Sequence, residues 1–271
     1  MQRQRETAEK FRALHARGRL LILPNAWDAA SAKLAETACA EAIATSSAAL
    51  AWSHGYADGQ FLPATVFLAA VREIVRIAKV PVTVDSEMGF ADTPDGTAQF
   101  VMALAEAGVV GINIEDRASP PELLAAKIKA IKTAAKAKGA DIFINARTDV
   151  YLHNLVNDGE KVAEVIRRGK LYAEAGADGL FVPALNDLAG LREVANAIDL
   201  PINVLTMKAT PPVAQLKEAG VRRVSAGAGP GRAAYGAAAR AMKMLMDEGK
   251  YDAMFSSAAD CPDFNKLFET N

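Results

Sequence analysis

Two carboxylates stand two residues apart at the end of an apolar run, where they could share a metal ion. The run 82–84 (Val-Thr-Val) follows Pro81 and predicts a buried strand, and Asp85 and Glu87 come directly after it. Alternate residues of a strand point to one face, so we expect both acids to leave the strand on the same side. Burying two like charges is unfavourable unless a cation lies between them, and a divalent cation is one interpretation. The other interpretation is that one acid caps the next helix while the second pairs with a basic side chain.

Polar side chains also follow the other apolar runs, at positions where strands are expected to end. The acids in this set, Asp58, Asp85, Glu87 and Glu115, supply only oxygen donors, and no His or Cys stands with them at ligand spacing. Hard oxygen ligands suit Mg2+ or Mn2+, which usually keep several waters. The polar residues outside this acid group are Asn25, Trp27, Asp28, Ser46, Ser47, Asn113, Asp116, Asn145, Arg147, Asp149 and Lys208.

Arg147 is the expected partner of a substrate carboxylate, because a guanidinium can bind a carboxylate through two parallel hydrogen bonds. Its alternative role is a salt bridge to Glu115 or Asp149, and both roles can hold together. The turn 46–48 (Ser-Ser-Ala) could hold an anion on its backbone N–H groups, or could simply reverse the chain. A cation beside an arginine suits a 2-oxo acid, whose oxygens chelate the metal while the metal stabilises an enolate. Such a site serves C–C cleavage, decarboxylation, enolisation or hydrolysis next to a ketone.

The elements that would position these residues recur along the chain as helix, glycine and strand. Helix-patterned segments end in Glu-Ala-Gly at 106–108, 174–176 and 218–220, and an apolar run follows each of them. This repetition is typical of successive βα units. Eight short apolar runs are predicted to be strands buried on both faces: 20–24, 42–47, 82–87, 111–116, 142–148, 179–184, 202–206 and 223–227.

Eight such units in a chain of this length favour a (β/α)8 barrel over an open doubly wound sheet. An open sheet would carry a Gly-rich fingerprint after the first strand, and residues 25–27 (Asn-Ala-Trp) do not resemble one. We therefore predict a single α/β barrel domain over residues 1–271. It has an N-terminal helix at about 1–19 and a C-terminal helix and tail at about 231–271. In a barrel the polar strand ends meet at one mouth.

The composition is that of a globular domain, because the 271 residues are 51% hydrophobic and 23% charged, with a formal net charge of -1. This balance predicts neither a nucleic acid nor a membrane surface as partner. The segment 1–10 is charged and lacks an apolar core, so we expect no signal peptide, and no apolar run is long enough to span a bilayer. The two cysteines, Cys39 and Cys261, exclude a disulfide framework. We expect a buried thiol at Cys39 and a cytoplasmic protein.

Six motifs, in order along the chain, resemble those of the isocitrate lyase/phosphoenolpyruvate mutase superfamily. The resemblance runs from about Leu20 to about Gly227, and the combination is specific although each motif is weak alone. It implies a (β/α)8 TIM barrel whose C-terminal helix is swapped with a neighbouring subunit, in a homodimer or homotetramer. It also implies an Mg2+-dependent site for small 2-oxo or 2-hydroxy carboxylates. The motifs are Pro24-Asn25-Ala26-Trp27-Asp28, Ser46-Ser47, residues 52–59 (WSHGYADG), residues 85–90 (DSEMGF), residues 111–116 (GINIED) and residues 145–149 (NARTD).

Carried over residue by residue, the resemblance implies roles for particular side chains. It implies metal ligation by Asp85, Glu87 and Glu115, with Asp58 assisting the metal shell. It implies that Arg147 binds the substrate carboxylate, so we expect the catalytic group to be Arg147, Asp58 and Glu115. The backbone of Ser46, Ser47 and Ala48 matches the turn that holds substrate oxygens in the family. The full set of expected substrate contacts is Trp27, Ser46, Ser47, Ala48, Asp85, Asn113, Arg147 and Thr206.

One segment departs from the family pattern. Lyases of the family carry a mobile gating loop after the fourth strand, with a Lys-Lys-Cys-Gly-His-type motif whose Cys donates a proton. Here residues 117–122 (Arg-Ala-Ser-Pro-Pro-Glu) follow Asp116, and a helix pattern resumes at once. A lid excludes water and completes a site, so the short loop argues against a standard isocitrate or methylisocitrate lyase and against a mutase. It leaves the general acid or base unassigned among His54, Tyr56, Lys208 and Arg117.

Four hypotheses for function follow. The first is an Mg2+-dependent lyase or decarboxylase acting on a small 2-oxo or 2-hydroxy dicarboxylate through an enolate. The second is a phosphonopyruvate or 2-oxo acid hydrolase, or a mutase, on the same site. The third is a barrel that binds a 2-oxo acid with little turnover because the gating loop is short. The fourth is an imine-forming aldolase that uses Lys208, and residues 227–231 could instead cradle a phosphate at the eighth strand.

Overall fold

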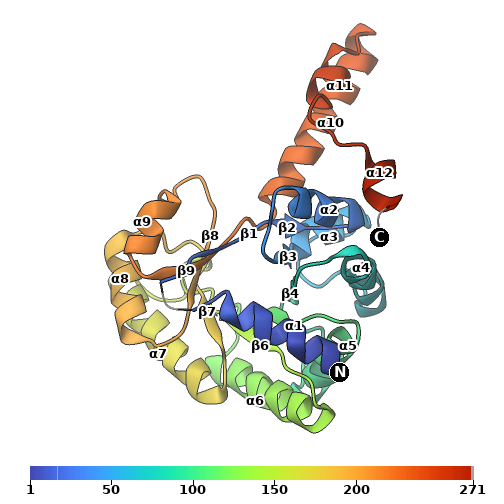
Figure 1. Cartoon of the computed structure of the whole chain (residues 1–271). Coiled ribbons are helices and arrows are strands. Elements are labelled where there is room, and N and C mark those ends of the chain that lie inside the picture. The colour runs from blue at the N-terminus through green and yellow to red at the C-terminus, as the bar shows by residue number, and fades with distance from the viewer. Residues whose placement is uncertain (17, 270–271) are drawn as a thin grey trace.

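The computed structural model of the chain describes residues 1–16 and 18–269, which form a barrel of parallel strands surrounded by helices (Figure 1). The strand segments are β1 (Leu21–Leu23), β2 (Asn25–Ala26), β3 (Ile43–Thr45), β4 (Val82–Asp85), β5 (Gly111–Glu115), β6 (Phe143–Arg147), β7 (Gly179–Phe181), β8 (Ile202–Leu205) and β9 (Val221–Ser225). They pair in the order β1-β9-β8-β7-β6-β5-β4-β3-β2. β1 and β2 are consecutive pieces of one strand, so the pairing of β1 with β9 and of β2 with β3 closes the barrel. The predicted α/β barrel is confirmed.

Pro24 divides the first strand into β1 and β2, because proline has no N–H to donate to a sheet ladder. The strand changes partner at this point. The N–H of Ala226 donates to the carbonyl of Leu23, and the N–H of Ala44 donates to the carbonyl of Pro24, each at 3.1 Å. The chain then stays in the sheet as far as Ala26, beyond the predicted end of the strand. The split is a local effect of one proline and leaves the eightfold closure intact.

Helices alternate with the strands and form the outer layer (Figure 1). They are α1 (Gln2–Ala13), α2 (Ala29–Thr37), α3 (Ser47–Ser53), α4 (Ala64–Ile77), α5 (Pro94–Glu106), α6 (Pro121–Lys138), α7 (Lys161–Ala175), α8 (Leu188–Ala197), α9 (Val213–Glu218), α10 (Gly229–Glu248), α11 (Asp252–Ser257) and α12 (Phe264–Glu269), with a short 3-10 turn at Asp158–Glu160. α6 and α7 both end on left-handed glycines, Gly139 and Gly176, and the stop at Gly176 is one of those predicted.

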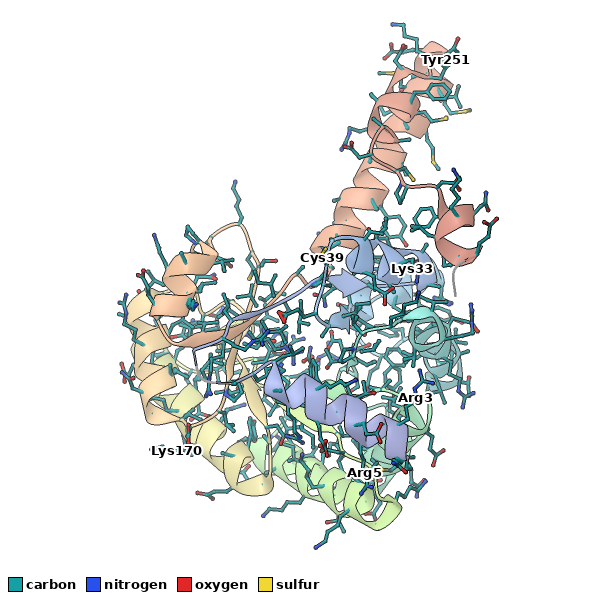
Figure 2. All side chains as sticks on the ribbon, in the orientation of Figure 1. Arg3, Arg5, Lys33, Cys39, Lys170 and Tyr251 are labelled. Carbon is teal, nitrogen blue, oxygen red and sulfur yellow. The ribbon has the colours of Figure 1, made fainter. Side chains whose placement is uncertain are left out.

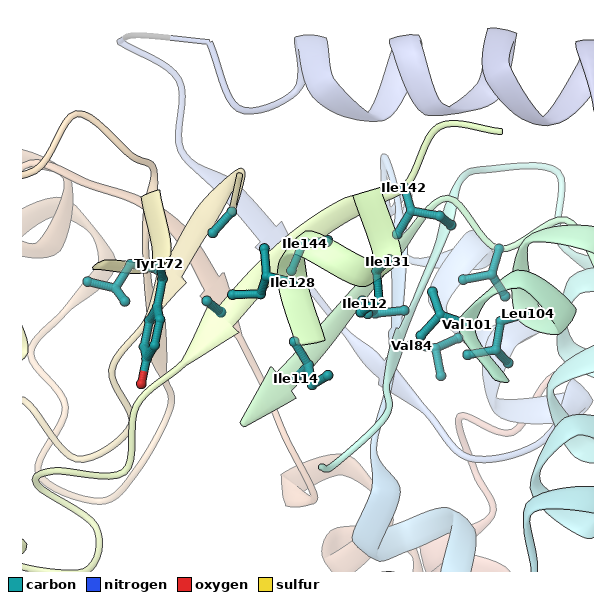
Figure 3. Packing of buried hydrophobic residues seen from close by; sticks show 14 of the residues in the cluster. Val84, Val101, Leu104, Ile112, Ile114, Ile128, Ile131, Ile142, Ile144 and Tyr172 are labelled. Carbon is teal, nitrogen blue, oxygen red and sulfur yellow. The ribbon is translucent and has the colours of Figure 1, made fainter. Parts of the chain in front are cut away.

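Branched aliphatic side chains bury the outer face of the central strands against this helical layer. Val84, Ile112 and Ile144 are fully buried on β4, β5 and β6, and they pack with Leu104 of α5 and Ile128 of α6 (Figure 3). Each such side chain contributes roughly 1.5–3 kcal/mol through burial. The packing holds the strands rigidly, so it also fixes the polar side chains at their carboxyl ends.

The inner face of the barrel is lined with buried polar side chains, although the strands were identified from their apolar residues. Asn145 donates to Asn113 (2.8 Å) and to Asn203 (3.1 Å), and all three side chains are buried. Arg223 is also buried, donates to Asn113 (3.2 Å) and lies 5.8 Å from the centre of the Phe11 ring. Complete burial lowers the pKa of Arg223 to about 9. Hydrogen-bonded amides and an arginine therefore fill the barrel interior, and this network includes Asn113 and Asn145, which were expected at the mouth.

α1 covers the amino ends of the strands and closes that end of the barrel (Figure 1). Phe11 is fully buried, and its ring meets the edge of Phe143 with 5.4 Å between centroids. Gln4 donates to the carbonyls of Val109 (2.9 Å) and Asp141 (2.6 Å), which precede β5 and β6. This end of the barrel is therefore filled by side chains, which leaves the carboxyl ends of the strands as the place for a ligand site. The helix is shorter than the predicted 1–19.

His15 follows α1 and is buried under the barrel. Its ring stacks on Phe143 with 4.3 Å between centroids, and its Nδ1 lies 2.9 Å from the carbonyl oxygen of Phe11. Burial, followed by the nearby charge of Arg223, lowers the pKa of His15 to about 3. An unfolded chain binds this proton near pH 6.5, so the stabilisation is complete above that pH and is lost as the pH falls toward 3.

We expect acidification from pH 7 to pH 4.5 to lower the free energy of unfolding by about 2–3 kcal/mol through His15 alone. His15→Gln cannot take up the proton, so its stability should depend less on pH by that amount. Urea unfolding at the two pH values measures both proteins. His54→Gln, at an exposed position, is the matched control and should keep the wild-type dependence. Equal pH dependence in His15→Gln and wild type would assign the acid sensitivity to other groups.

α10 and α11 extend away from the barrel, with Tyr251 near the far end of the extension, and α12 turns back toward α2 (Figures 1 and 2). α10 begins at Gly229, two residues before the predicted start of the C-terminal helix. Met242 and Met246 on this helix are 64% and 81% exposed. The predicted exchange of this extension with a second subunit stays a prediction. Among the described residues, no helix combines the length and apolar character needed to cross a bilayer.

Cys39 differs from its prediction. Its thiol is exposed rather than buried, and the residue lies just after the end of α2 with a left-handed backbone (φ 60°) (Figure 2). The helix pattern ends before it, at Thr37, because the chain must turn there toward β3.

Candidate active site

A small cavity opens at the carboxyl ends of the strands. Its volume is about 140 Å³. A water molecule occupies about 30 Å³ in the liquid, so the cavity suits a ligand of only a few heavy atoms. β5 and β6 supply Glu115 and Arg147, and the start of α3 supplies Ser47. The lining residues are Ser47, Asp58, Gly59, Glu87, Glu115, Arg117, Arg147, Leu152 and His153.

Asp85 is the last residue of β4, and one of its two carboxylate oxygens has a partner. The hydroxyl of Ser47 donates to Oδ2 at 2.8 Å, and the backbone N–H of Asp85 donates to the hydroxyl of Thr45 at 3.0 Å. Oδ1 is buried and has no hydrogen-bond partner in the protein. A buried, unsatisfied carboxylate oxygen is destabilising by at least 1–3 kcal/mol. The residue is therefore arranged to receive a positively charged or hydrogen-bonding group that the protein itself does not supply.

Glu87 lies in a turn and not on the strand, which corrects the argument from alternation. β4 ends at Asp85, and Glu87 has a left-handed backbone with φ of 49°, a conformation that is strained for glutamate. The side chain is nevertheless 5% exposed and lines the cavity. Burial, followed by the charges of Asp85 and Asp58, raises the pKa of Glu87 to about 7. The turn, rather than strand periodicity, brings the two acids into one electrostatic group.

Gly89 explains why the turn can be so tight. Its φ is 91°, and a Cβ atom there would lie 2.5 Å from the side chain of Thr97 on α5. Only glycine fits this approach without displacing the helix. The conformation that points Glu87 into the cavity thus depends on a residue two positions away.

Arg147 joins the acids of two neighbouring strand ends. Its Nη1 lies 2.6 Å from Glu115, while Nε and Nη2 donate to the two oxygens of Asp149 at 2.6 and 3.1 Å. The predicted salt bridge to Glu115 or Asp149 is therefore formed with both. Burial, opposed by Arg147 and reinforced by Asp85, raises the pKa of Glu115 well above its ordinary value. Arginine has five N–H groups, so these three contacts leave two for a ligand.

Asp116 anchors this network from behind the cavity. Its side chain is fully buried, accepts from Arg168 (2.8 Å) and from the hydroxyl of Tyr172 (2.5 Å), and accepts from the backbone N–H of Asp149 (3.0 Å). Tyr172 is itself buried against the strand layer (Figure 3). The position of Asp149, and through it that of Arg147, is therefore set by α7.

Not every predicted site residue lies on the cavity. Trp27 packs on Tyr235 of α10 with 6.2 Å between ring centroids, and Thr206 is exposed beside a separate hollow with Leu20 and Ile22. Asn113 lies deeper, in the amide network of the barrel interior. Ser46 caps α3 by accepting from the N–H of Ala49, so the turn 46–48 is the start of a short helix. Of the predicted set, the cavity collects Ser47, Asp58, Glu87, Glu115 and Arg147 directly, and Asp85 through Ser47.

The four residues considered as general acid or base lie in different places. Only Arg117 lines the cavity, 3.6 Å from Glu115, with a left-handed φ of 46°. His54 ends α3 with its ring on the carbonyl of Leu50, and Tyr56 and Lys208 are exposed. His153 was not singled out from the sequence, although it stands four residues after Asp149 in a loop that follows a barrel strand, where functional residues gather.

Two glycines of the segment 227–231, Gly227 and Gly231, are explained by close contacts within the protein. The N–H of Gly227 donates to the side chain of Asn25 at 2.9 Å, and a Cβ atom at Gly231 would lie 2.8 Å from Ala49. Gly231 therefore lets α10 approach α3 closely. The phosphate-cradle interpretation therefore loses one of its N–H donors to Asn25.

The side chains at the mouth fit a hard cation, although they do not enclose one. In the described part of the chain, no three His, Cys, Asp or Glu side chains stand together as a ready ligand group. Mg2+ commonly uses one or two carboxylates and fills its other positions with water and substrate oxygens. The free Oδ1 of Asp85 and the raised pKa of Glu87 are what such a site would show. The metal role of Asp85, Glu87 and Glu115 stays a prediction.

Comparison with known proteins places the chain in a family. Residues 11–246 match the family model described as phosphoenolpyruvate phosphomutase. The chain is 37% identical over 241 residues to an uncharacterised protein of Mycobacterium tuberculosis, with 88% of this chain and 89% of that protein covered. It is 30% identical over 284 residues to the 2-methylisocitrate lyase of Halalkalibacterium halodurans, with 98% and 90% covered.

Comparison with solved structures agrees with the sequence comparisons. The structure superposes with a TM-score of 0.87 on a Burkholderia cenocepacia protein assigned as a lyase or mutase, at 32% identity and with 99% of this chain and 96% of that chain covered. The resemblance drawn from the six sequence motifs is confirmed. The chain therefore belongs to the phosphoenolpyruvate phosphomutase family of the isocitrate lyase/phosphoenolpyruvate mutase superfamily, and is an enzyme of that superfamily.

Proposed function

We propose that the protein is an Mg2+-dependent lyase that cleaves or decarboxylates a small 2-oxo or 2-hydroxy carboxylate in the cavity at the strand ends. The observation that carries the proposal is Asp85, whose Oδ1 is buried without a partner and whose Oδ2 accepts from Ser47. Ser47 lines a cavity that Arg147 also lines. A cation site beside an arginine matches the two ends of a 2-oxo acid. Several curated relatives of the chain are 2-methylisocitrate lyases, which supports a lyase.

The side chains in and beside this cavity would have different roles. Asp85, with Glu87 and Glu115 through water, would hold the cation, which when bound supplies Lewis acidity to the ketone and carboxylate oxygens. Arg147 would bind the carboxylate with its two remaining N–H groups, in an orientation fixed by Glu115 and Asp149. The volume of about 140 Å³ excludes large substrates from the closed part of the site. The short segment after Asp116 leaves one side of the mouth accessible.

The proposal is tested by titrating the wild-type protein with oxalate, a pyruvate-enolate mimic, in the presence of Mg2+ or of EDTA. We expect calorimetry to detect oxalate binding with Mg2+ and at least a 100-fold weaker affinity with EDTA, because the cation supplies most of the charge attraction. Turnover is then assayed with oxaloacetate, isocitrate, 2-methylisocitrate, 2,3-dimethylmalate and phosphonopyruvate. We expect at least one carbon–carbon bond cleavage that requires Mg2+.

Each alternative predicts a different result. Cleavage of phosphonopyruvate alone would favour the hydrolase, and Mg2+-dependent oxalate binding without turnover would favour a binding barrel. Borohydride trapping of a substrate on Lys208, with activity that survives EDTA, would replace the metal proposal by an imine mechanism. The exposure of Lys208 argues against this last outcome, because an imine-forming lysine needs a desolvated site.

A further inference from the structure

His153 lines the cavity although it belongs to no group assigned above. It lies in the loop that follows β6, and its backbone N–H donates to the carbonyl of Asp149 at 2.9 Å. Its Nε2 stands 3.5 Å from Oδ2 of Asp149, and its side chain is 44% exposed. One ring nitrogen of His153 therefore faces a buried carboxylate, and the residue borders the cavity in which a ligand would bind.

Asp149 is held in a fixed position beside this imidazole. Its side chain is fully buried, and the same carboxylate accepts from Nε and Nη2 of Arg147. Its backbone is held by Asp116, which Arg168 and Tyr172 fix in turn. One carboxylate thus orients both the guanidinium proposed to bind the substrate carboxylate and the imidazole beside it. A ligand gripped by Arg147 would have a fixed position relative to His153.

Of the other residues on the cavity wall, Asp58 and Glu87 belong to the acidic group proposed to hold the cation, and four more have fixed charges or are already paired. The guanidinium groups of Arg117 and Arg147 stay charged. The hydroxyl of Ser47 is donated to Asp85, and Glu115 is paired with Arg147. Imidazole is the side chain most often used in general acid–base catalysis, and a carboxylate partner commonly fixes its orientation. The distance of 3.5 Å to Asp149 is long for a hydrogen bond, but such contacts often shorten when a substrate binds.

We propose that His153 is the catalytic acid–base of this site, exchanging a proton with the carbon next to the carbonyl of a 2-oxo acid. As base, the imidazole takes the proton as the C–H bond breaks. The electron pair of that bond forms the C=C bond of the enolate, while the π pair of the carbonyl moves onto its oxygen. As acid, the imidazolium returns a proton to the same carbon and becomes neutral, while the ketone re-forms. After C–C cleavage, the second step would convert an enolate product into a 2-oxo acid. This inference rests on the proposed function.

The test follows exchange of the methyl protons of pyruvate for deuterium in D2O with Mg2+, measured by NMR. Wild-type protein is expected to exchange them faster than Mg2+ alone, and His153→Gln to lose at least 100-fold of the enzymatic rate. Oxalate binding with Mg2+ should stay within twofold in this variant, because its cation and carboxylate contacts are intact. His54→Gln, exposed and away from the cavity, is the matched control and should exchange at the wild-type rate.

His153→Ala, with imidazole added to the buffer, provides the second variant. Partial recovery of the exchange rate would support proton transfer at this position, since a structural role would gain nothing from free imidazole. Wild-type exchange in His153→Gln, or no exchange by a wild-type protein that binds oxalate with Mg2+, would overturn the inference and leave the proposed function standing. Failure of wild-type protein to bind oxalate with Mg2+ would overturn both.

Discussion

Asp85→Asn is expected to weaken Mg2+-dependent oxalate binding by more than 100-fold. Loss of a residue that only supports a metal ligand typically costs 10–100-fold in metal affinity, and loss of a direct carboxylate ligand should exceed that. Asparagine has nearly the shape of aspartate and can still accept the hydrogen bond from Ser47, so the local structure should persist. Calorimetric titration of both proteins with oxalate at a fixed Mg2+ concentration measures the effect.

The free energy of unfolding of Asp85→Asn is a second measurement, independent of oxalate binding. The buried Oδ1 of Asp85 has no partner in the protein without a cation, so removing its charge should leave the free energy of unfolding unchanged or raised in EDTA. Asp92→Asn, at an exposed position, is the control and should change neither binding nor unfolding. Oxalate affinity equal to wild type in Asp85→Asn would show that the carboxylate holds no metal.

The architecture could be predicted because its signals are local. Several helices, among them α5, α7 and α9, end next to a glycine, and each apolar run is short enough to be only a strand, so the βα repeat is visible without tertiary information. Pro24 is equally local, yet its effect was missed because a proline at a strand end usually terminates the strand. Here the strand continues on the other side with a new partner.

The depth of a polar residue in the barrel could not be read from the sequence. Asn113 and Glu115 are alternate residues of β5, and both point inward, as the period of two requires. They lie about 6–7 Å apart along the strand. That distance separates the cavity from the interior, where Asn113 bonds Asn145 and Arg223. The alternating pattern therefore predicted correctly that both side chains face inward. It did not show that Asn113 lies below the mouth of the barrel.

Contacts between segments distant in the sequence account for the remaining differences between the predicted and the observed site residues. Trp27 was expected to touch substrate because it follows the first strand, but α10 begins about two hundred residues later and covers it through Tyr235. His153 reaches the cavity because the loop after β6 folds back over Asp149. Neither contact can be predicted from the local pattern of hydrophobic and polar residues.

Arg147→Met is expected to lower the free energy of unfolding by about 3–5 kcal/mol and to abolish detectable oxalate binding. The variant leaves Glu115 and Asp149 buried without their shared cation, and breaking one partner of a buried ion pair is destabilising by that amount. Arg76→Met is the matched control, since Arg76 also pairs with a carboxylate at 2.7 Å but on the exposed surface of α4. Its loss should change stability by less than about 1 kcal/mol. Urea unfolding compares the two.

Arg147→Lys separates the structural role of this residue from its role in binding. An ammonium keeps the positive charge between Glu115 and Asp149, so much of the stability should return, but it cannot form the planar pair of hydrogen bonds that a carboxylate ligand requires. We expect oxalate affinity to stay at least tenfold below wild type in a variant that is more stable than Arg147→Met. If Arg147→Lys binds oxalate as tightly as wild type, the guanidinium serves only to neutralise the two acids. The substrate carboxylate must then be held elsewhere, and Arg117 is the other cation on the cavity wall.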